Sequence, residues 1–272
     1  MCYITRREPF SEGVFTNTFF ESKKQQQIKD AQRTSVLMDF LAFDPSSTNQ
    51  VFDQFKTLSF YIYRENPEQK SERFIYIEGW RKDKVLLVAH ADTYWDSRYE
   101  NVKLYIDEEN HIKRIQGIGG DDRAGCAVLW LLKDLGHSLL LVDSEEIGCL
   151  GSIWLAEHNK DIMDRINSQH SFVVEFDRQG SLDYKCYNVG TDKFRSYIEE
   201  VLGFTEPNKL FASDIVYLCR DICGVNLSVG FYDEHTEIEY VNLTEWLYLA
   251  GLYEDWLSGD FSEIYRLGEK ES

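Results

Sequence analysis

The sequence predicts an α/β fold of three layers, in which a mixed, mostly parallel central sheet carries helices on both faces. From residue 84 onward, short apolar runs alternate with longer amphipathic runs, as expected for strands joined by helices. The apolar runs are continuous, which is typical of strands buried on both faces. The chain has 272 residues, 43% of them hydrophobic, so it is long enough to bury a large core.

The first 80 residues predict a helix and extra strands ahead of the main sheet. Residues 22–41 have a helical pattern. The runs LSFYIY and RFIYIEG flank the polar turn ENPEQKSE, and this arrangement predicts an antiparallel hairpin. The segment KLYIDEENHIKRIQ gives two more strand-like pieces about a DEEN turn. We expect all of these strands to be edge or additional strands.

The regular part of the chain alternates strand, helix, strand, helix and strand. These five segments are, in order, VLLVAHAD, DRAGCAVLWLLKDLG, SLLLVDSEE, SIWLAEHNKDIMDRI and SFVVEFD. A later run, NLSVGF at 226–231, predicts another buried strand, and we expect helices on either side of it at 212–222 and 241–258. These segments supply both the sheet and the helices that cover it.

The chain shows no sign of division into several domains. It has no segment rich in Pro, Gly and Ser and no internal repeat. We therefore expect one domain over residues 1–272, with its motifs between about 84 and 245. The opening residues lack the apolar run of a signal peptide, and no segment has the roughly 20 apolar residues that span a bilayer. The sequence predicts a cytoplasmic protein.

The charge of the chain argues against two classes of partner. It has 29 Lys and Arg against 47 Asp and Glu, a formal net charge of −18. Such a charge repels phosphate backbones and anionic lipid surfaces, so we expect neither nucleic acid nor a membrane as a partner. Carboxylates that surround divalent cations are neutralised when the ions bind, so part of the charge is only formal.

The cysteines predict buried, reduced thiols. They lie singly in apolar or strand-like segments, without zinc-finger or secreted-framework spacing. The six are Cys2, Cys126, Cys149, Cys186, Cys219 and Cys223. Cys219 and Cys223 are four apart on an expected helix, but no second pair accompanies them, which favours a structural role over metal binding.

Residues with metal-binding side chains gather where the predicted strands end. In open α/β sheets, ligands bind beyond the carboxyl ends of the strands. The residues that follow strands or precede a helix there are His90, Asp92, Asp121, Asp122, Glu145, Glu146, Asp177 and His235. Each alone has a structural explanation, such as a hydrogen-bonded histidine, a helix cap or a solvated turn. Together, however, like charges converging at one edge repel one another unless a cation holds them.

The number of these residues fits a pair of divalent ions. Two ions about 3.5–4 Å apart that share a bridging carboxylate and a water each need one more histidine and one more carboxylate. His90, His235 and three of the acids meet this requirement. The remaining acids match two further roles, a general base from the pair Glu145 and Glu146 and a hydrogen-bond partner, Asp92, for His90. Local pattern does not decide which glutamate is the base.

Five short motifs resemble, in order and spacing, those of the co-catalytic metallopeptidases, which include zinc aminopeptidases and tripeptidases. The motifs are HAD at 90–92, GGDDRAG at 119–125, DSEEIG at 143–148, EFD at 175–177 and DEHT at 233–236. The resemblance covers residues 84 to 245 and leaves the first 80 unmatched. It implies a zinc-peptidase-like fold and two divalent ions, with zinc expected and cobalt or manganese accepted by the same ligands.

The resemblance also implies a role for each site residue. The implied metal ligands are His90 and Asp177 for one ion, Glu146 and His235 for the other, and Asp121 as the bridge. Asp122 is the next candidate for the bridge. Glu145 is then the implied general base and Asp92 the implied support of His90. The implied activity is amide hydrolysis by a metal-activated water, with a small peptide or aminoacyl compound as substrate.

One departure bears on the branch of the family. Many relatives carry a separate lid or dimerisation domain between the last carboxylate and the final histidine, whereas here Asp177 and His235 are only 58 positions apart. This spacing favours the compact single-domain aminopeptidase branch. Carboxypeptidases and N-acyl amino acid deacylases of the same fold remain alternatives, as does a binding module that kept the fold without catalysis.

Other residues near the motifs have open roles. A clamp for a substrate carboxylate needs a basic residue, and Arg123 and Arg178, each next to a proposed ligand, are the candidates; both fit a surface or salt-bridged role equally well. Aromatic residues that flank the ligands either line a substrate pocket or pack structurally. They are Tyr94, Trp95, Phe231 and Tyr232.

Overall fold

The computed structural model describes residues 12–95, 103–114, 117–208 and 212–268, with side chains from residue 23 onward. The helices are α1 (Glu12–Ala42), α2 (Thr48–Phe55), α3 (Gly120–Leu131), α4 (Leu150–His158), α5 (Lys160–Gln169), α6 (Asp192–Leu202), α7 (Ile215–Leu218) and α8 (Leu243–Leu257). The strands are β1 (Tyr61–Glu65), β2 (Arg73–Ile77), β3 (Leu86–His90), β4 (Tyr105–Ile106), β5 (His111–Lys113), β6 (Ser138–Val142), β7 (Val173–Arg178), β8 (Tyr184–Lys185), β9 (Gly224–Ser228), β10 (Phe231–Tyr232) and β11 (Tyr240–Asn242).

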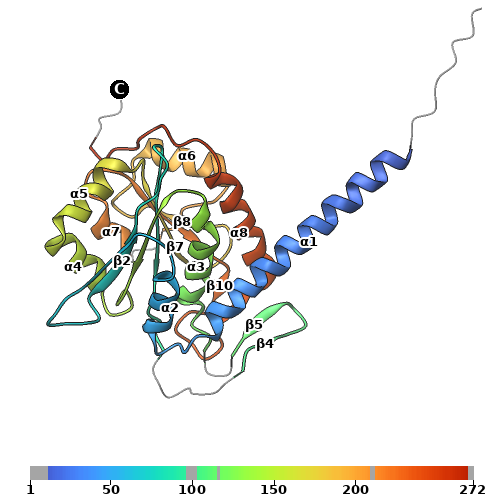
Figure 1. The fold of residues 1–272 in the computed structure, drawn as a ribbon, viewed down its shortest axis with the longest axis horizontal. Helices are drawn as coiled ribbons and strands as arrows, with labels where there is room; N and C mark the ends of the chain where they lie inside the picture. Colours follow the sequence, from blue (N-terminus) through green and yellow to red (C-terminus); the bar gives the residue numbers. More distant parts are fainter. Residues whose placement is uncertain (1–11, 96–102, 115–116, 209–211, 269–272) are drawn as a thin grey trace, which may run out of the picture.

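The main sheet has seven strands in the order β1-β2-β6-β3-β7-β9-β8. Strands β6, β3, β7 and β9 are parallel, and β1, β2 and β8 join at the two edges as antiparallel strands. In Figure 1, α3 and α8 lie on one side of the sheet and α4 and α5 on the other. The predicted three-layer α/β fold with a mixed, mostly parallel sheet is confirmed, and so is the predicted β1–β2 hairpin.

The central strands are buried on both faces because each face packs against helices. In β3, Leu87 and Ala89 pack in a core with residues of α1, α2, α3, α6 and α8, whereas Leu86 and Val88 pack in a second core with α4, α5 and α7. Successive side chains of a strand point to opposite faces, so both sets must be apolar. Burial of each such side chain contributes roughly 1.5–3 kcal/mol. This explains the continuous apolar runs in the sequence.

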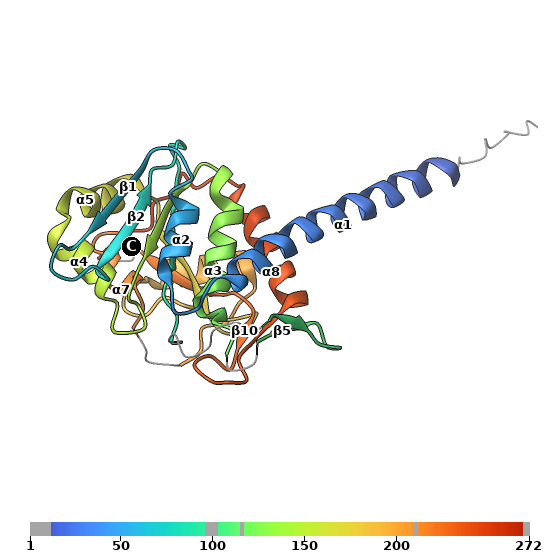
Figure 2. The same ribbon diagram turned by 60° about the horizontal axis from the view of Figure 1, so that its bottom comes forward.

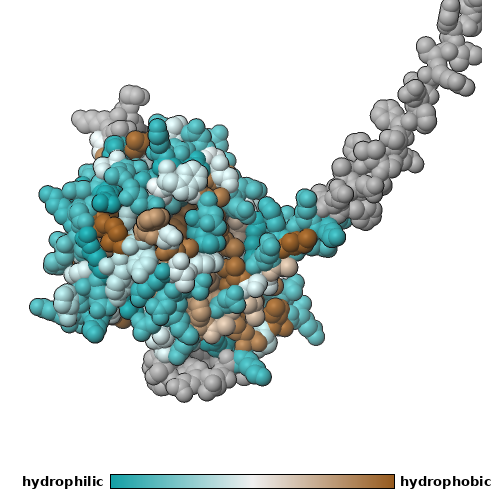
Figure 3. Space-filling model, in the orientation of Figure 1, coloured by the Kyte–Doolittle hydropathy of each residue, from teal (hydrophilic) through white to brown (hydrophobic). Residues whose placement is uncertain are grey.

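Helix α1 begins earlier than predicted and projects from the body of the molecule, as both ribbon views show (Figures 1 and 2). Its 31 residues give it a length of about 46 Å. Its C-terminal part packs against α3 and α8, where Arg33 lies 2.5 Å from Glu254 of α8. The face in Figure 3 is mostly hydrophilic, with hydrophobic side chains gathered near the place where α1 meets the body.

A second sheet of four antiparallel strands, in the order β10-β11-β5-β4, lies beside the main one. Strands β4 and β5 are the two pieces expected from the segment around the DEEN turn, and they pair with each other as predicted. Strands β10 and β11 form a hairpin whose loop carries His235. This sheet therefore brings the last histidine of the motif set to the main sheet.

Two predicted helices differ from those observed. The helix expected over 152–166 is broken at Asn159. The side-chain amide of Asn159 donates a hydrogen bond to the carbonyl oxygen of Trp154 and so competes with the helical backbone. The helix expected at 212–222 spans only the four residues of α7. The side chain of Asn167 accepts hydrogen bonds from the backbone N–H groups of Arg220 and Asp221, at 2.8 and 2.9 Å, and draws this segment out of the helix.

The strand expected over 226–231 divides between the two sheets. Strand β9 ends at Ser228, and β10 begins at Phe231 in the second sheet. Gly230 between them has a φ of 80°, and a Cβ there would lie 3.1 Å from the backbone nitrogen of Trp246. The turn thus requires glycine, a constraint that an apolar run does not reveal. The predicted helix at 241–258 is confirmed as α8.

The cysteines of the described residues are buried and carry no disulfide. Cys219 and Cys223 do not share a helix, because α7 ends at Leu218. The prediction that this pair lies on one helix is therefore wrong. Cys2 lies outside the described residues. Among the helices within the described ranges, none combines the length and apolar composition needed to cross a membrane.

Candidate metal centre

The motif residues come from different elements and meet at one edge of the main sheet. His90 closes β3, Asp177 lies near the end of β7, and Glu145 and Glu146 follow β6. Asp121 stands at the start of α3. Parallel strands present their carboxyl ends at the same edge, which explains why residues far apart in sequence converge here.

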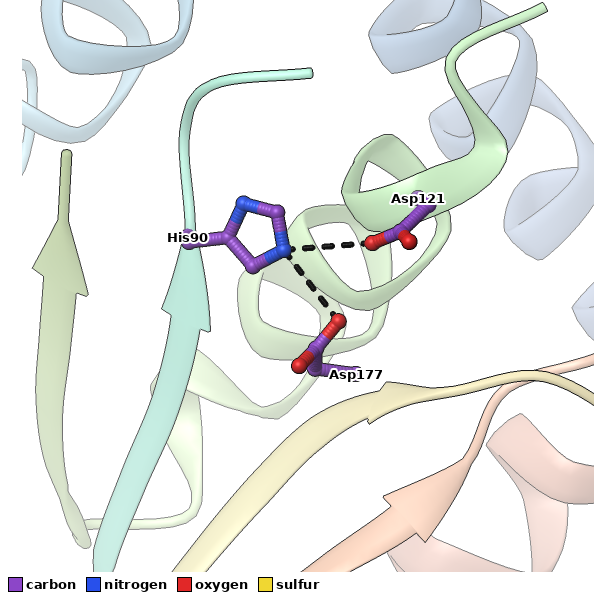
Figure 4. A group of neighbouring side chains, drawn as sticks. All are labelled: His90, Asp121 and Asp177. Carbon is purple, nitrogen blue, oxygen red and sulfur yellow. Dashed lines mark hydrogen bonds and ion pairs between the residues drawn. The ribbon is translucent and has the colours of Figure 1, made fainter. Parts of the chain in front are cut away.

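One group of side chains surrounds the imidazole of His90. Its Nε2 lies 3.2 Å from Oδ1 of Asp121 and 3.1 Å from Oδ1 of Asp177. Figure 4 shows the ring at the end of β3 pointing between the two carboxylates, one from α3 and one from β7. The three ligand atoms lie within 4.8 Å of one another, close enough to surround one ion.

A second group shares Asp121 with the first. Nε2 of His235 lies 3.4 Å from the other carboxylate oxygen of Asp121, Oδ2, and 2.8 Å from Oε2 of Glu146. These ligand atoms also lie within 4.8 Å of one another. The two oxygens of Asp121 thus face two different histidines, which is the arrangement that a bridging carboxylate requires.

The backbone at Asp121 is held by Glu239, a buried residue that the sequence analysis did not single out. Its carboxylate accepts hydrogen bonds from the backbone N–H of Gly119 at 2.9 Å and of Asp121 at 3.1 Å. It also accepts one from Nε1 of Trp95 at 2.9 Å. Glu239 follows His235 in an acid-rich segment, and nothing in the local pattern separates it from the exposed acids there.

Asp122 turns away from the histidine nitrogens. Its carboxylate accepts hydrogen bonds from the backbone N–H of His90 at 3.2 Å and of Gly125 at 2.9 Å. Gly125 is required at this point, because a Cβ there would lie 1.8 Å from the carbonyl oxygen of Phe176. Asp122 therefore ties the start of α3 to β3.

Asp92 links His90 to the two glutamates. Its carboxylate lies 3.3 Å from Nδ1 of His90, the ring nitrogen that does not face Asp121 and Asp177. The same carboxylate accepts hydrogen bonds from the backbone N–H groups of Glu145 and Glu146, each at 3.0 Å. Asp92 thus fixes the ring and the segment that follows β6 together.

Glu145 and Glu146 have different surroundings. Oε2 of Glu146 contacts His235, whereas its Oε1 is buried without a hydrogen-bond partner among the described residues. Glu145 lines the same cavity but belongs to neither ligand group. Burial raises the pKa of Glu145 to about 9, and the negative charge of Asp177 adds to the effect.

Asp177 is oriented by Asn226 of β9, which the sequence analysis also missed. The backbone N–H of Asp177 donates to the side-chain oxygen of Asn226 at 3.0 Å, and the Asn226 amide donates to Oδ2 of Asp177 at 3.3 Å. This leaves Oδ1 of Asp177 facing His90. A buried polar residue in an otherwise apolar strand was the available signal, since such a residue must find a partner.

Protons bind strongly where these carboxylates crowd together. Burial and the like charge of Asp121 raise the pKa of Asp177 to about 7. Hydrogen bonds to Asp121 and Glu146 raise the pKa of His235 to about 11. Burial opposes the charged form of His90, but the charge of Asp177 and the hydrogen bond to Asp121 outweigh it and raise the pKa of His90. A site that attracts protons in this way also attracts metal cations.

A cavity of about 340 Å³ opens over these side chains. Its lining residues are Asp121, Glu145, Glu146, Asp177, Arg178, Gln179, Tyr187, Ala212, Phe231, Glu234 and His235. Pockets for small ligands measure roughly 300–1,000 Å³, so the cavity suits a small substrate. A larger cavity of about 720 Å³ lies elsewhere, around residues 78–84 and 168–171, and contains none of the motif residues.

The flanking aromatic residues divide between the two expected roles. Phe231 lines the cavity, and the exposed ring of Tyr94 stacks on the imidazole of His235, with centroids 4.7 Å apart. Trp95 is buried, and Tyr232 stacks on Tyr240 at 5.2 Å and donates a hydrogen bond to the carboxylate of Glu245. Trp95 and Tyr232 thus have packing roles.

Arg123 does not reach the substrate side of the site. It is buried, and its guanidinium donates hydrogen bonds to the carbonyl oxygens of Ala91, Asp44 and Ser47 at 2.5, 3.2 and 3.2 Å. It is therefore a structural residue. The other candidate for a carboxylate clamp, Arg178, lines the cavity.

Comparison with known proteins places the fold among peptidases. No protein-family model matches the chain, and a search of curated proteins found no match. Among solved structures, aminopeptidase PepT from Bacillus cereus matches with a TM-score of 0.60 and 12% identity, over 84% of this chain and 98% of that one. A tripeptidase from Staphylococcus aureus matches with a TM-score of 0.61 and 13% identity, over 84% and 98%.

The TET1 peptidase of Pyrococcus horikoshii, which can assemble into a tetrahedron or a large octahedral shell, also matches. Its TM-score is 0.54 and its identity 13%, over 83% of this chain and 99% of that one. All three matches extend over most of both chains. The chain therefore shares the fold of these peptidases, as the resemblance implied.

Proposed function

We propose that the chain is a metal-dependent hydrolase that cleaves amide bonds in small peptides, acting as an aminopeptidase with two divalent ions. One observation carries the proposal: two groups of metal-binding side chains share Asp121, and all their members except the buried His90 line one cavity together with Glu145. The fold shared with aminopeptidases supports the reaction class. In this proposal, residues 1–272 form one catalytic domain.

The donor atoms fit two ions of the zinc type. Histidine nitrogen and carboxylate oxygen are both ligands that zinc accepts, and cobalt or manganese bind similar sets. Oε1 of Glu146 is buried without a hydrogen-bond partner among the described residues, so this oxygen is available to bind a cation. His90 and Asp177 would hold one ion, Glu146 and His235 the other, and Asp121 both.

The residues around these ligands have the chemistry that hydrolysis needs. Divalent ions, when bound, lower the pKa of a water molecule and polarise the substrate carbonyl. Glu145 accepts the proton of the attacking water and delivers it to the nitrogen of the leaving amine, so the carboxylate is regenerated in each cycle. Asp92 keeps Nδ1 of His90 occupied, so that Nε2 faces the ligand group.

The cavity fits the proposed substrate in charge and size. A peptide's N-terminal amine is positive, and the carboxylates of Glu146 and Asp177 lie at the cavity wall. At about 340 Å³, the cavity is near the lower limit for small-ligand pockets. These two properties favour short peptides with a free N-terminus.

The test compares free and blocked N-termini. Protein stripped by a chelator and reloaded with zinc or cobalt is assayed on aminoacyl p-nitroanilides and on the same compounds after N-acetylation. We expect hydrolysis of the free compounds to depend on the added metal and N-acetylation to abolish it. Hydrolysis of an N-acetyl amino acid, or of an N-acetyl dipeptide with a free C-terminus, in place of the free anilides would instead identify a deacylase or a carboxypeptidase. Metal-loaded protein that cleaves none of them would indicate a binding module.

A further inference from the structure

Arg178 is a largely buried cation in the wall of the proposed active-site cavity. It follows Asp177 in β7, and its side chain is only 10% exposed. Among the described residues that line the cavity, it is the only Lys or Arg. The cavity is otherwise rich in carboxylates, so this positive charge is exceptional in its surroundings.

The guanidinium of Arg178 is poorly satisfied. Its Nε is buried without a hydrogen-bond partner among the described residues, and its nearest ion pair, from Nη2 to Oδ2 of Asp183, is long at 3.7 Å. Nε of Arg123 is also buried without a partner, but its two Nη atoms donate to three backbone carbonyls, a support that Arg178 lacks among the described residues. Leaving a buried charged donor without an acceptor is costly. A ligand carboxylate would supply the acceptors that the protein does not.

The backbone of β7 explains how Arg178 reaches the cavity beside its neighbour. Successive strand residues ordinarily point to opposite faces. Here the pairing of β7 with β9 shifts register between Glu175 and Arg178, which marks a bulge or irregularity. Such irregularities redirect side chains and are frequent beside active sites. Asp177 and Arg178 therefore both line the same cavity.

We propose that Arg178 binds a carboxylate of the substrate, so that the cavity selects short peptides carrying a negative charge close to the scissile bond. The guanidinium fork matches a carboxylate in two parallel hydrogen bonds. This inference rests on the proposed function for the scissile bond, but carboxylate binding itself needs no turnover. The carboxylate belongs either to an acidic N-terminal side chain or to the C-terminus of a dipeptide, and both lie within reach in a cavity of about 340 Å³.

Two matched substrate pairs distinguish these sources. Glutamyl and glutaminyl p-nitroanilide differ only in the side-chain carboxylate, and an Ala–Ala dipeptide and its C-terminal amide differ only in the terminal one. We expect wild-type protein to prefer the charged member of one pair by roughly 10- to 150-fold in kcat/KM, the range for hydrogen bonds to charged groups. In Arg178→Gln that preference should disappear, while the rate on the neutral member changes little.

Binding is measured separately so that carboxylate selection does not depend on catalysis. Calorimetry on zinc-loaded protein uses two pairs in which –CH2–NH– replaces the scissile amide and prevents cleavage. One pair is the reduced glutamyl and glutaminyl anilides, and the other is reduced Ala–Ala and its C-terminal carboxamide. The charged member of the selected pair should bind more tightly to wild type, and Arg178→Gln should remove the difference. Selective binding without turnover on any substrate would contradict the proposed function while supporting this inference.

Two further variants guard against a structural explanation. Arg178→Lys keeps the charge but loses the fork, and we expect it to retain part of the preference. Arg220→Gln removes the same charge from an exposed position and should leave the preference intact. Two results would overturn the inference. One is a loss of rate or affinity in Arg178→Gln that is equal for the charged and the neutral member of a pair, and the other is equal affinity of the wild type for both members. A large fall in unfolding temperature in Arg178→Gln would also overturn it, because it would assign Arg178 to a structural pair with Asp183.

Discussion

At the scale of single residues, the central distinction is between the neighbours Glu145 and Glu146. They share a backbone anchor in Asp92, but only Glu146 contacts a histidine. Glu145 belongs to neither ligand group, and burial raises its pKa to about 9. Cations on the nearby carboxylates would reduce the repulsion from Asp177, so metal binding favours the ionised form that a general base needs.

The first prediction exchanges each glutamate for its amide. Glu145→Gln should keep both ions yet lose about 10²–10⁴ in turnover, the contribution usually assigned to a general acid–base group. Glu146→Gln should weaken the binding of one ion, because it replaces a carboxylate that contacts His235. Metal analysis and kcat for both variants check this. If Glu145→Gln loses metal and Glu146→Gln loses only rate, the two roles are exchanged.

The second prediction concerns Asp92. In Asp92→Asn, an amide –NH2 group would face a donor, either the imidazole N–H or one of the backbone N–H groups of Glu145 and Glu146. We expect a loss of about 10- to 100-fold in metal affinity or activity, the range for residues that orient metal ligands. Asp134→Asn, at an exposed position, is the control and should have no effect. An equally unaffected Asp92→Asn would contradict the positioning role.

The third prediction is a release of protons when metal binds. In the metal-free protein, hydrogen bonds to Asp121 and Glu146 raise the pKa of His235 to about 11, and burial raises that of Asp177 to about 7. A histidine must lose its proton to bind a cation, so zinc affinity should fall as the pH is lowered. Calorimetry in buffers of different ionisation enthalpy should detect protons released at pH 7.5. No net release would show that the histidines are not ligands.

The sequence predicted the site residues whose side-chain types are unusual at strand ends. Two histidines and several acids at strand ends predicted the residues that the structure brings together, because few other arrangements place so many charges at one edge. Glu239 and Asn226 could not be found in this way. They act through backbone N–H groups and through the carboxylate of Asp177, and neither residue type by itself indicates a metal site.

At the scale of elements, hydropathy predicted the strands and long helices, whereas single polar contacts decided where other elements end. The runs around β3, β6 and β7 were predicted because burial on both faces demands apolar residues at every position. The break at Asn159 depends on a hydrogen bond from its own side chain to Trp154, and the short α7 depends on hydrogen bonds to the distant Asn167. A hydropathy pattern does not contain these contacts.

The fourth prediction tests the packing of α3 against β7. In Gly125→Ala the new Cβ would lie 1.8 Å from the carbonyl oxygen of Phe176 and 2.2 Å from Asp122, so the start of α3 must move. We expect a loss of about 1–3 kcal/mol in unfolding free energy, typical of overpacking, together with weaker metal binding. In Gly251→Ala, in α8, the new Cβ would lie 3.2 Å from Nη1 at the end of the Arg33 side chain, which needs to move by only a few tenths of an ångström, so this variant should be much less destabilised. Equal behaviour of the two variants would argue against this account.

At the scale of the whole molecule, the net charge of −18 includes the carboxylates of the proposed metal centre. The main sheet brings carboxylates from β7, the β6 loop and the start of α3 to one edge, and the second sheet adds His235. Binding of cations there should stabilise the folded chain, since the ions bind only where the fold has assembled their ligands. Fold and site therefore depend on each other.

The most direct test of the account is the number of ions held per chain by wild type, Asp121→Ala and His235→Ala after zinc loading and dialysis. Asp121 faces both histidines, whereas His235 belongs to one ligand group. The account predicts two ions in wild type, one in His235→Ala, and loss or weakening of both in Asp121→Ala. One ion in fully loaded wild type, or two tightly bound ions in Asp121→Ala, would contradict it.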